Sequence, residues 1–294
     1  MKQLCCLFYL FGFLVSAQEN QLIHQVGLQI DNDLFVPQEE DNYYTSGIII
    51  NYTSEINSFL FLERRENERM LLDASLMQQL YTPIYPNSTY LDNYDRPFAG
   101  WLAARLQLRK LKDEKTFIYG LEVGVTGNAS FGRQLHQGFH DLMHIEEKPE
   151  WLAQIPSEIM MNVNFGYAYE LKKWFVPSIK TTAGTKDIYI EPDLLFLINM
   201  DYDSFLLPDQ KTKLSGYFNT NYRLVGYNAL IDGSMFYKKP IVAKKVAHHL
   251  WSASAGVQLQ VRNFGFRIAY MYTTKETKEM HYHLFGSVKM FYLF

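Results

Sequence analysis

KTFIYGLEVGVT, residues 115–126, alternates between apolar side chains and small or polar ones. Its apolar members, from Phe117 to Val125, fall on one face of a β-strand, and Thr116, Glu122 and Thr126 fall on the other, because successive side chains point to opposite faces. A strand that spans a bilayer needs about 9 to 11 residues, with lipid on one face and a polar lumen on the other. This stretch therefore predicts one strand of a membrane barrel.

The same alternation recurs along the chain. It is clear in 97–109, 158–171, 251–262, 264–273 and 282–294, and weaker in 23–33, 45–53, 70–81, 174–185, 189–200 and 216–227. Together these stretches predict an all-β fold, a transmembrane antiparallel β-barrel of about twelve strands, an even number as single-chain bacterial barrels require. The terminal aromatic residue, Phe294, is typical of outer-membrane barrels. A soluble β-sandwich is the alternative, but it does not explain polar residues repeated on one face of so many long strands.

The chain begins with Lys2 and an apolar run that ends at Ser16-Ala17. This pattern predicts a signal peptide over residues 1–17, followed by one outer-membrane barrel domain over residues 18–294. Cys5 and Cys6 fall inside the signal, so the exported chain would have no thiol and no cysteine-based site. A net charge of −3 argues against a nucleic-acid partner, whereas 21 Tyr and 21 Phe suit aromatic girdles at a membrane surface.

One helix is predicted in this β protein, over residues 131–144, in an extracellular loop between two strands. His136, His140 and His144 lie one above another at helical spacing, while Leu135 and Phe139 belong to the opposite face. The first pair can bind a transition metal, although no Glu follows His136 as in the HExxH pattern, and a solvated polar face is the alternative. The apolar face is free to pack on the barrel or on acyl chains.

Strand counting gathers polar motifs at the same rim as this helix. Asp31-Asn32-Asp33 ends the first strand, and Thr45 and Asp95-Arg96 begin strands that return from that rim. Asp and Asn also form turns by bonding their own backbone, which is the plainer reading. Together, however, their oxygens suit a hard cation, and a histidine near its neutral pKa can take a proton from water. The rim is therefore a candidate hydrolytic site.

Several motifs at this rim resemble a known family, the outer-membrane lipid A 3′-O-deacylases, LpxR. The similar residues run from the first strand to the last: Asp31-Asn32-Asp33-Leu34-Phe35, Asp41-x-x-Tyr44-Thr45-x-Gly47, Tyr81-Thr82-Pro83, Asp95-Arg96-Pro97-Phe98-Ala99-Gly100-Trp101, Gly127-x-Ala129-Ser130, His140, Trp151-x-x-Gln154-x-x-x-Glu158, Leu230-Ile231-Asp232-Gly233 and Thr273-Thr274-Lys275-Glu276. The resemblance implies a twelve-stranded barrel that removes the 3′-acyloxyacyl chain from lipid A with Ca²⁺, its active site facing the outer leaflet of the bacterial outer membrane.

The resemblance also implies roles for individual residues. His140 matches the base that activates water, and Asp33 with Asn32 matches the Ca²⁺ site. Thr45 belongs to the catalytic polar cluster. A further set is expected to support the base or bind substrate: Glu146 or alternatively Glu158 to orient the histidine, His136 beside it, and Arg96 with Asp95 toward the phosphates of lipopolysaccharide. A monomer surrounded by outer-membrane lipids is expected.

The chain departs from the family at three of these positions. His136 stands where Gln is usual, Asn128 where Pro is usual and Phe98 where Tyr is usual. A histidine at 136 is expected to change how the site responds to pH, while His144 is expected to be solvated. Two other functions stay open: a passive channel or structural barrel, and a phospholipase barrel, although Ser130 lacks the GxSxG context of a serine nucleophile.

Overall fold

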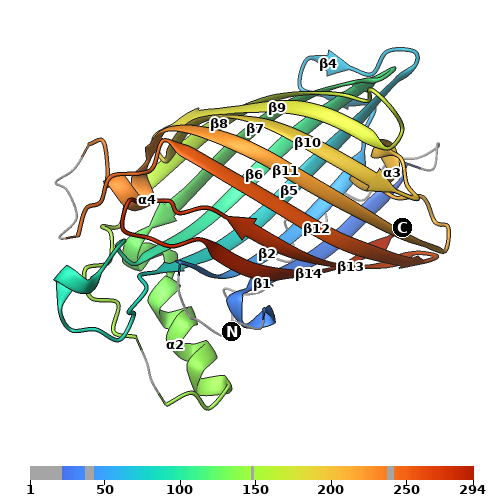
Figure 1. The fold of residues 1–294 in the computed structure, drawn as a ribbon. Coiled ribbons are helices and arrows are strands. Elements are labelled where there is room, and N and C mark those ends of the chain that lie inside the picture. The colour runs from blue at the N-terminus through green and yellow to red at the C-terminus, as the bar shows by residue number, and fades with distance from the viewer. Residues whose placement is uncertain (1–21, 37–42, 147–148, 237–241) are drawn as a thin grey trace, which may run out of the picture.

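The alternating stretches form the strands of a closed antiparallel barrel (Figure 1). This computed structural model describes residues 22–36, 43–146, 149–236 and 242–294. The predicted signal peptide, both cysteines and Asp41 lie outside the described residues. Within the described chain, twelve strands pair in the order β1-β14-β13-β12-β11-β10-β9-β8-β7-β6-β5-β2. The predicted barrel and its strand number are confirmed.

The elements have the following bounds: β1 His24–Asn32, η1 Asp33–Phe35, β2 Tyr43–Glu55, β3 Ser58–Phe59, β4 Leu62–Glu63, β5 Glu68–Thr82, η2 Leu91–Asn93, β6 Ala99–Lys112, β7 Lys115–Thr126, η3 Gly127–Ser130, α2 Gly132–Leu142, β8 Ile159–Tyr169, β9 Phe175–Gly184, β10 Asp187–Ile198, α3 Tyr202–Leu206, β11 Lys213–Asn228, α4 Ala229–Asp232, β12 His249–Val261, β13 Phe264–Thr273 and β14 His283–Leu293. Strand β7 has the predicted bounds, whereas β11 starts at Lys213 rather than at 216. Backbone pairing continues past the alternating side chains because the ladder depends on N–H and C=O groups.

The two faces of the barrel wall differ as a membrane requires. Charged pairs fill the lumen, among them Arg223 with Glu191 at 2.6 Å and Arg109 with Asp73. The outer face carries exposed Ile, Leu, Val and Phe side chains along the strands. Aromatic rings contact one another near both ends, Trp251 with Tyr272 at the α2 rim, centroids 5.4 Å apart, and Trp174 with Phe196 at the opposite rim, 6.4 Å apart. This arrangement suits a wall that lipid surrounds.

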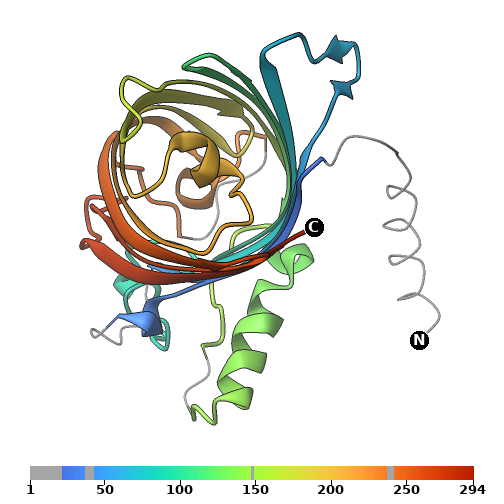
Figure 2. The same ribbon diagram turned by 90° about the vertical axis from the view of Figure 1, so that its right-hand side faces the viewer.

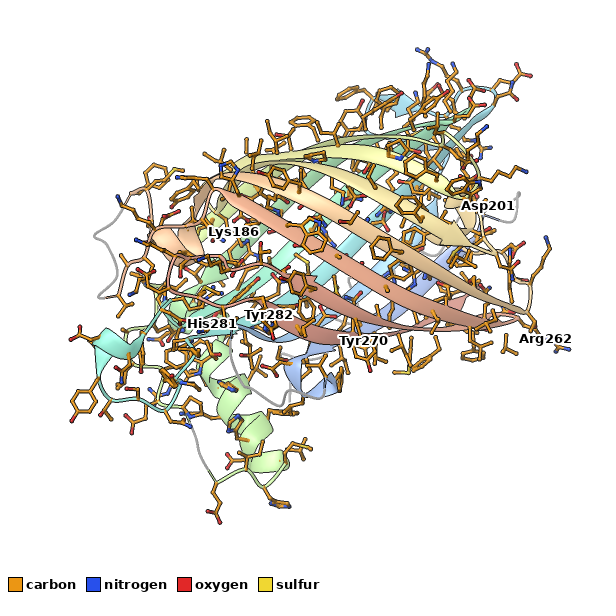
Figure 3. All side chains as sticks on the ribbon, viewed as in Figure 1. Lys186, Asp201, Arg262, Tyr270, His281 and Tyr282 are labelled. Atoms are coloured by element: carbon orange, nitrogen blue, oxygen red, sulfur yellow. The ribbon has the colours of Figure 1, made fainter. Side chains whose placement is uncertain are left out.

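Connections between strands lie at two rims. The α2 rim holds the described parts of six connections, residues 33–36, 83–98, 127–146 with 149–158, 185–186, 229–236 with 242–248, and 274–282, and the opposite rim holds the others. In Figure 3, Lys186 and His281 lie near the α2 rim, and Asp201 and Arg262 lie at the opposite one. The two long connections at the opposite rim contain structure that the sequence did not predict, the β3–β4 hairpin and α3.

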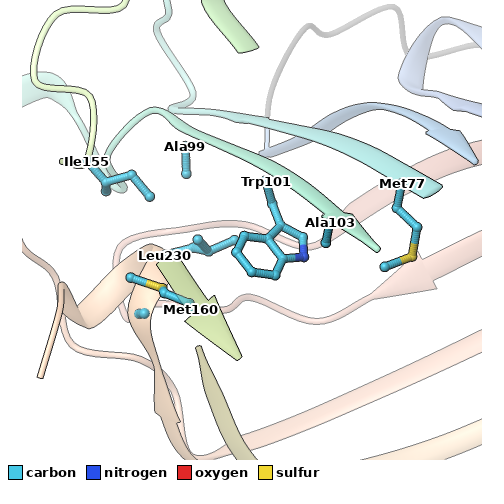
Figure 4. Packing of buried hydrophobic residues seen from close by; sticks show 8 residues of the cluster. Met77, Ala99, Trp101, Ala103, Ile155, Met160 and Leu230 are labelled. Atoms are coloured by element: carbon cyan, nitrogen blue, oxygen red, sulfur yellow. The ribbon is translucent and has the colours of Figure 1, made fainter. Parts of the chain in front are cut away.

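Buried apolar clusters lie at both ends of the barrel. At the α2 rim, Leu230 of α4 lies beside Trp101 and Met160 (Figure 4), in a buried cluster that also includes Met77. At the opposite rim, α3 lies across the barrel end (Figure 2), and Leu207 packs with Leu71, Leu111 and Leu293. Within the described chain, no helix has the length and apolar character to cross a membrane.

Candidate active site

Helix α2 projects outward from the barrel wall at the α2 rim (Figures 1 and 2). It begins after η3 because Phe131, with φ of 58°, takes a left-handed conformation that separates the two helices. Its first residue, Gly132, rests on Gly100 of β6, and a Cβ on Gly100 would collide with the Ser130 hydroxyl. Only glycine permits this approach, which anchors the helix to the wall.

The outer wall and α2 enclose a cavity of about 490 Å³, which we call the wall cavity. Its lining includes polar and apolar groups: Asn32, Asp33, Leu34, Thr45, Ser46, Ile48, Gln78, Leu80, Pro86, Asn87, Gln134, Leu135, His136, Gly138, Phe139, His140, Leu142 and Ile145. The alternate residues of β5, Met77 and Gln79, line the lumen instead. The wall cavity is therefore outside the barrel, on the side that faces lipid.

The Asp31-Asn32-Asp33 motif is divided between the two sides of the wall. Asp31 accepts a hydrogen bond at 2.9 Å from Tyr44, next to Gln79 of the lumen. Asn32 and Asp33 line the wall cavity. The Asn32 side chain also caps η1 by accepting from the Leu34 N–H at 2.8 Å, so the expected turn former and the expected site residue are the same.

Thr45 and Gln78 extend the polar part of the wall cavity. The β2–β5 register shifts between Tyr44 and Ser46, which brings Thr45 onto the cavity side, where its hydroxyl lies 2.8 Å from that of Thr82. Gln78 is 9% exposed, and within the described chain its Nε2 has no hydrogen-bond partner. The sequence did not indicate Gln78 as a site residue; an amide among the outward-facing apolar residues of β5 was the available signal.

The stacked histidines have different surroundings. His136 and His140 are buried, 2% and 6% exposed, with ring centroids 4.6 Å apart. His144 is exposed as predicted, but it lies beyond the end of α2 with a φ of 56°, so its predicted place on the helix is wrong. The Trp151 indole donates to His136 Nδ1 at 2.9 Å. The solvated-face alternative is thus wrong for the first two histidines. In α2 the apolar face is the exposed one, because beside a barrel wall that face meets lipid.

Other predicted site residues lie apart from the wall cavity. Arg96 is fully buried, pairs with Glu276 at 2.8 Å and stacks over Tyr81, while Asp95 accepts from the Ile84 N–H at 3.0 Å. These contacts join the 83–98 connection to the 274–282 connection. Neither Arg96 nor Asp95 lines the wall cavity, and their binding of phosphate stays a prediction.

The two carboxylates expected to orient the base are also outside the cavity lining. Glu146 follows α2 and is exposed. Glu158 precedes β8, and within the described chain its Oε1 is buried without a hydrogen-bond partner. The choice between them as the carboxylate that orients His140 stays a prediction.

The oxygen donors of the wall cavity suit a hard cation better than a transition metal. Asp33 contributes a buried carboxylate, Asn32 an amide oxygen and Thr45 a hydroxyl. In the part of the chain that is described, no group of three or more His, Cys, Asp or Glu side chains is arranged to hold a metal ion. A cation here would depend on neutral oxygens and water for most of its ligands.

Similarity to known proteins extends over nearly the whole chain. A family model described as outer membrane protein LpxR matches residues 3–294. The chain belongs to the LpxR family. LpxR from Salmonella typhimurium has a similar structure, with a TM-score of 0.74 and 15% identity over 92% of this chain and 100% of that one. A KdgM porin matches with a TM-score of 0.43 and 5% identity over 91% of this chain and 98% of that one. No curated protein matches the chain.

The motifs that this LpxR-family chain carries serve partly as structure. Glu276 of the TTKE motif pairs with Arg96. Asp232 of the LIDG motif accepts from the backbone N–H groups of Asn228 and Val246, which holds α4 over the lumen. The Ser130 hydroxyl is buried and donates to the Gly127 carbonyl at 2.6 Å. Ser130 is therefore not presented as a nucleophile.

Proposed function

We propose that this chain hydrolyses an ester-linked acyl chain of lipid A, the 3′-linked acyloxyacyl chain, in the outer leaflet of the outer membrane. The observation that carries the proposal is the wall cavity, which combines two buried histidines, a carboxylate and amides with Leu135, Phe139 and Leu80 on the outside of the barrel. A substrate that enters such a site from the bilayer needs an apolar chain beside a polar linkage. An acylated glycolipid has both.

His140 is the proposed base. It accepts a proton from water, and the water oxygen bonds to the acyl carbonyl carbon. The bond from that carbon to the sugar oxygen then breaks, and the sugar oxygen takes the proton from His140. One water is consumed, and a carboxylic acid and a hydroxyl group are released. The Gln78 amide N–H is suited to donate to the oxyanion that forms between these steps.

Asp33 and Asn32, with Thr45 nearby, are the residues that would hold Ca²⁺. When bound, the cation supplies positive charge that stabilises the oxyanion. Removal of the metal tests whether these residues bind Ca²⁺ for the reaction. EDTA is expected to stop acyl release, and added Ca²⁺ to restore it.

Two alternative functions fit the observations less well. A passive channel is favoured by an unobstructed lumen, whereas Leu230 and Leu207 belong to buried apolar clusters at the two rims and α3 lies across one barrel end (Figure 2). A phospholipase of the serine type needs an exposed nucleophile, and Ser130 is buried. Ser46 is the serine that lines the wall cavity, so Ser46→Ala tests that route directly.

Mass spectrometry of lipid A from expressing cells tests the proposal. Wild-type protein is expected to release the acyl chain, His140→Ala to abolish release, and the matched control His144→Ala, which changes an exposed histidine just beyond the end of α2, to retain it. Intact barrels are verified by their shifted mobility in unheated gels. Unchanged lipid A with folded wild-type protein, or full activity of His140→Ala, would contradict the proposal.

A further inference from the structure

The hydrogen bond between Trp151 and His136 determines the tautomer of that histidine. The indole N–H is a donor with no acceptor function, and it points at His136 Nδ1 at 2.9 Å. Nδ1 must therefore be the unprotonated, accepting nitrogen. The ring proton lies on Nε2, so His136 is held as the neutral Nε2–H tautomer.

Trp151 is itself held tightly. Its ring stacks on Phe98, with centroids 5.2 Å apart and planes 25° apart, and it lies against Gly132, where a Cβ would come within 2.8 Å of the indole. Its backbone has a φ of 56°, a left-handed conformation that is unfavourable for a bulky residue. Such a conformation persists where the surrounding structure requires it.

The loop around Trp151 is tied to the helix and to the wall. Gln137 of α2 donates to the Pro149 carbonyl at 2.9 Å, and the Ile155 N–H donates to the Phe98 carbonyl at 3.0 Å. The position of the indole is thus determined jointly by α2 and by Phe98, the residue that precedes β6. The His136 ring, which accepts a hydrogen bond from that indole, is therefore fixed in position relative to the barrel wall.

The His136 ring contacts the ring of the proposed base, His140, edge to face, with planes at 85°. The orientation of His136 therefore affects the orientation of His140. We propose that Trp151 is a positioning residue, which holds His136 as a neutral Nε2–H donor and, through that ring, orients His140 in the wall cavity. This inference rests on the proposed function for its effect on rate. The tautomer itself can be tested without any reaction.

Nitrogen NMR of ¹⁵N-histidine-labelled protein in detergent micelles reads the tautomer. His136→Gln identifies the His136 signals by their loss. The expected wild-type result is a protonated Nε2 and an unprotonated Nδ1. Trp151→Phe keeps the stacking on Phe98 but removes the N–H, so the two tautomers are expected to mix. A wild-type His136 protonated at Nδ1, or one whose tautomer Trp151→Phe leaves unchanged, would overturn the proposal.

Deacylation rates test the positioning effect. Trp151→Phe is expected to lower kcat about tenfold, as loss of one hydrogen bond does, with little change in KM. His136→Gln is expected to keep most activity, because its Oε1 accepts from the indole while its Nε2 donates, and His136→Leu to lose it. Trp174→Phe, an exposed tryptophan at the opposite rim, is the control.

The outcomes separate this inference from the proposed function. Equal rates for His136→Gln and His136→Leu would refute positioning through His136 even if the protein is a deacylase. Absence of acyl release by wild-type protein would refute the proposed function, and with it the effect on kcat. The NMR result would still decide whether Trp151 determines the tautomer.

Discussion

Replacing Gln78 with Leu is expected to raise the free energy of unfolding and to lower the rate of acyl release. Gln78 lies on the outer face of β5 and lines the wall cavity, and within the described chain its Nε2 is buried without a hydrogen-bond partner. A buried amide that lacks a partner costs about 1–3 kcal/mol. Leu has a similar size and no polar group, so the unfolding free energy is expected to rise by about 1 kcal/mol, the lower end of that range.

Activity should fall in the same variant. A hydrogen bond to a charged group contributes about 1.5–3 kcal/mol, which corresponds to a loss of roughly 10- to 100-fold in kcat if the amide donates to the oxyanion. The assay pairs thermal unfolding in detergent with the initial rate of acyl release. Gln107→Leu, which changes an amide of the lumen, is the control. A destabilised Gln78→Leu protein, or one with full activity, would refute the reasoning.

Two further predictions concern the support of the site. Gly100→Val is expected to displace α2, because its side chain meets Ser130 and Gly132, and to lower acyl release more than about tenfold while the barrel stays folded, as gel mobility would show; Gly216→Ala, which has space for a Cβ, is the control. Lys186→Met removes a partly buried ion pair with Asp187 at 2.5 Å, while Asp187 keeps a hydrogen bond from Asn162, and is expected to lower the unfolding free energy by about 2 kcal/mol in thermal unfolding. Burial by itself lowers the pKa of Lys186, but Asp187, Tyr81 and Glu122 outweigh it, so that the pKa lies above its usual value. The stabilisation is then fully present below the unfolded pKa of about 10.4 and is lost as pH rises beyond it, so the difference between variant and wild type should be the same at pH 6 and pH 8.

Helix α2 shows why the sequence pattern did not predict which face of the helix is buried. The sequence indicated its histidines and its opposite apolar face, and α2 forms within the predicted range but ends at Leu142, before His144. Which face would be buried depended on what surrounds it. Beside a barrel wall, Leu142 is 74% exposed and His140 is buried, the reverse of a helix on a water-soluble core.

Arg96 shows a second limit. Its position beside Asp95 at a strand start indicated the correct rim, but charge and spacing did not indicate its partner. Glu276, which pairs with it, lies 180 residues away along the chain. Pairing between distant connections depends on closure of the barrel, which brings the loops together. The sequence did not indicate Gln78 for a related reason. Only the tertiary structure shows that α2 lies over this amide and makes it part of the wall cavity.

The sequence by itself determined the strands, their number and the rim at which the polar motifs gather, because alternation has a period of two wherever lipid and lumen face opposite sides of a wall. It also carried the family resemblance. Only the tertiary structure decided on which side of the wall each polar residue lies, which histidines are buried, and that Trp151 bonds His136. Those properties depend on a one-residue register shift at Thr45 and on close contact between Gly100 and Gly132, which local sequence does not specify.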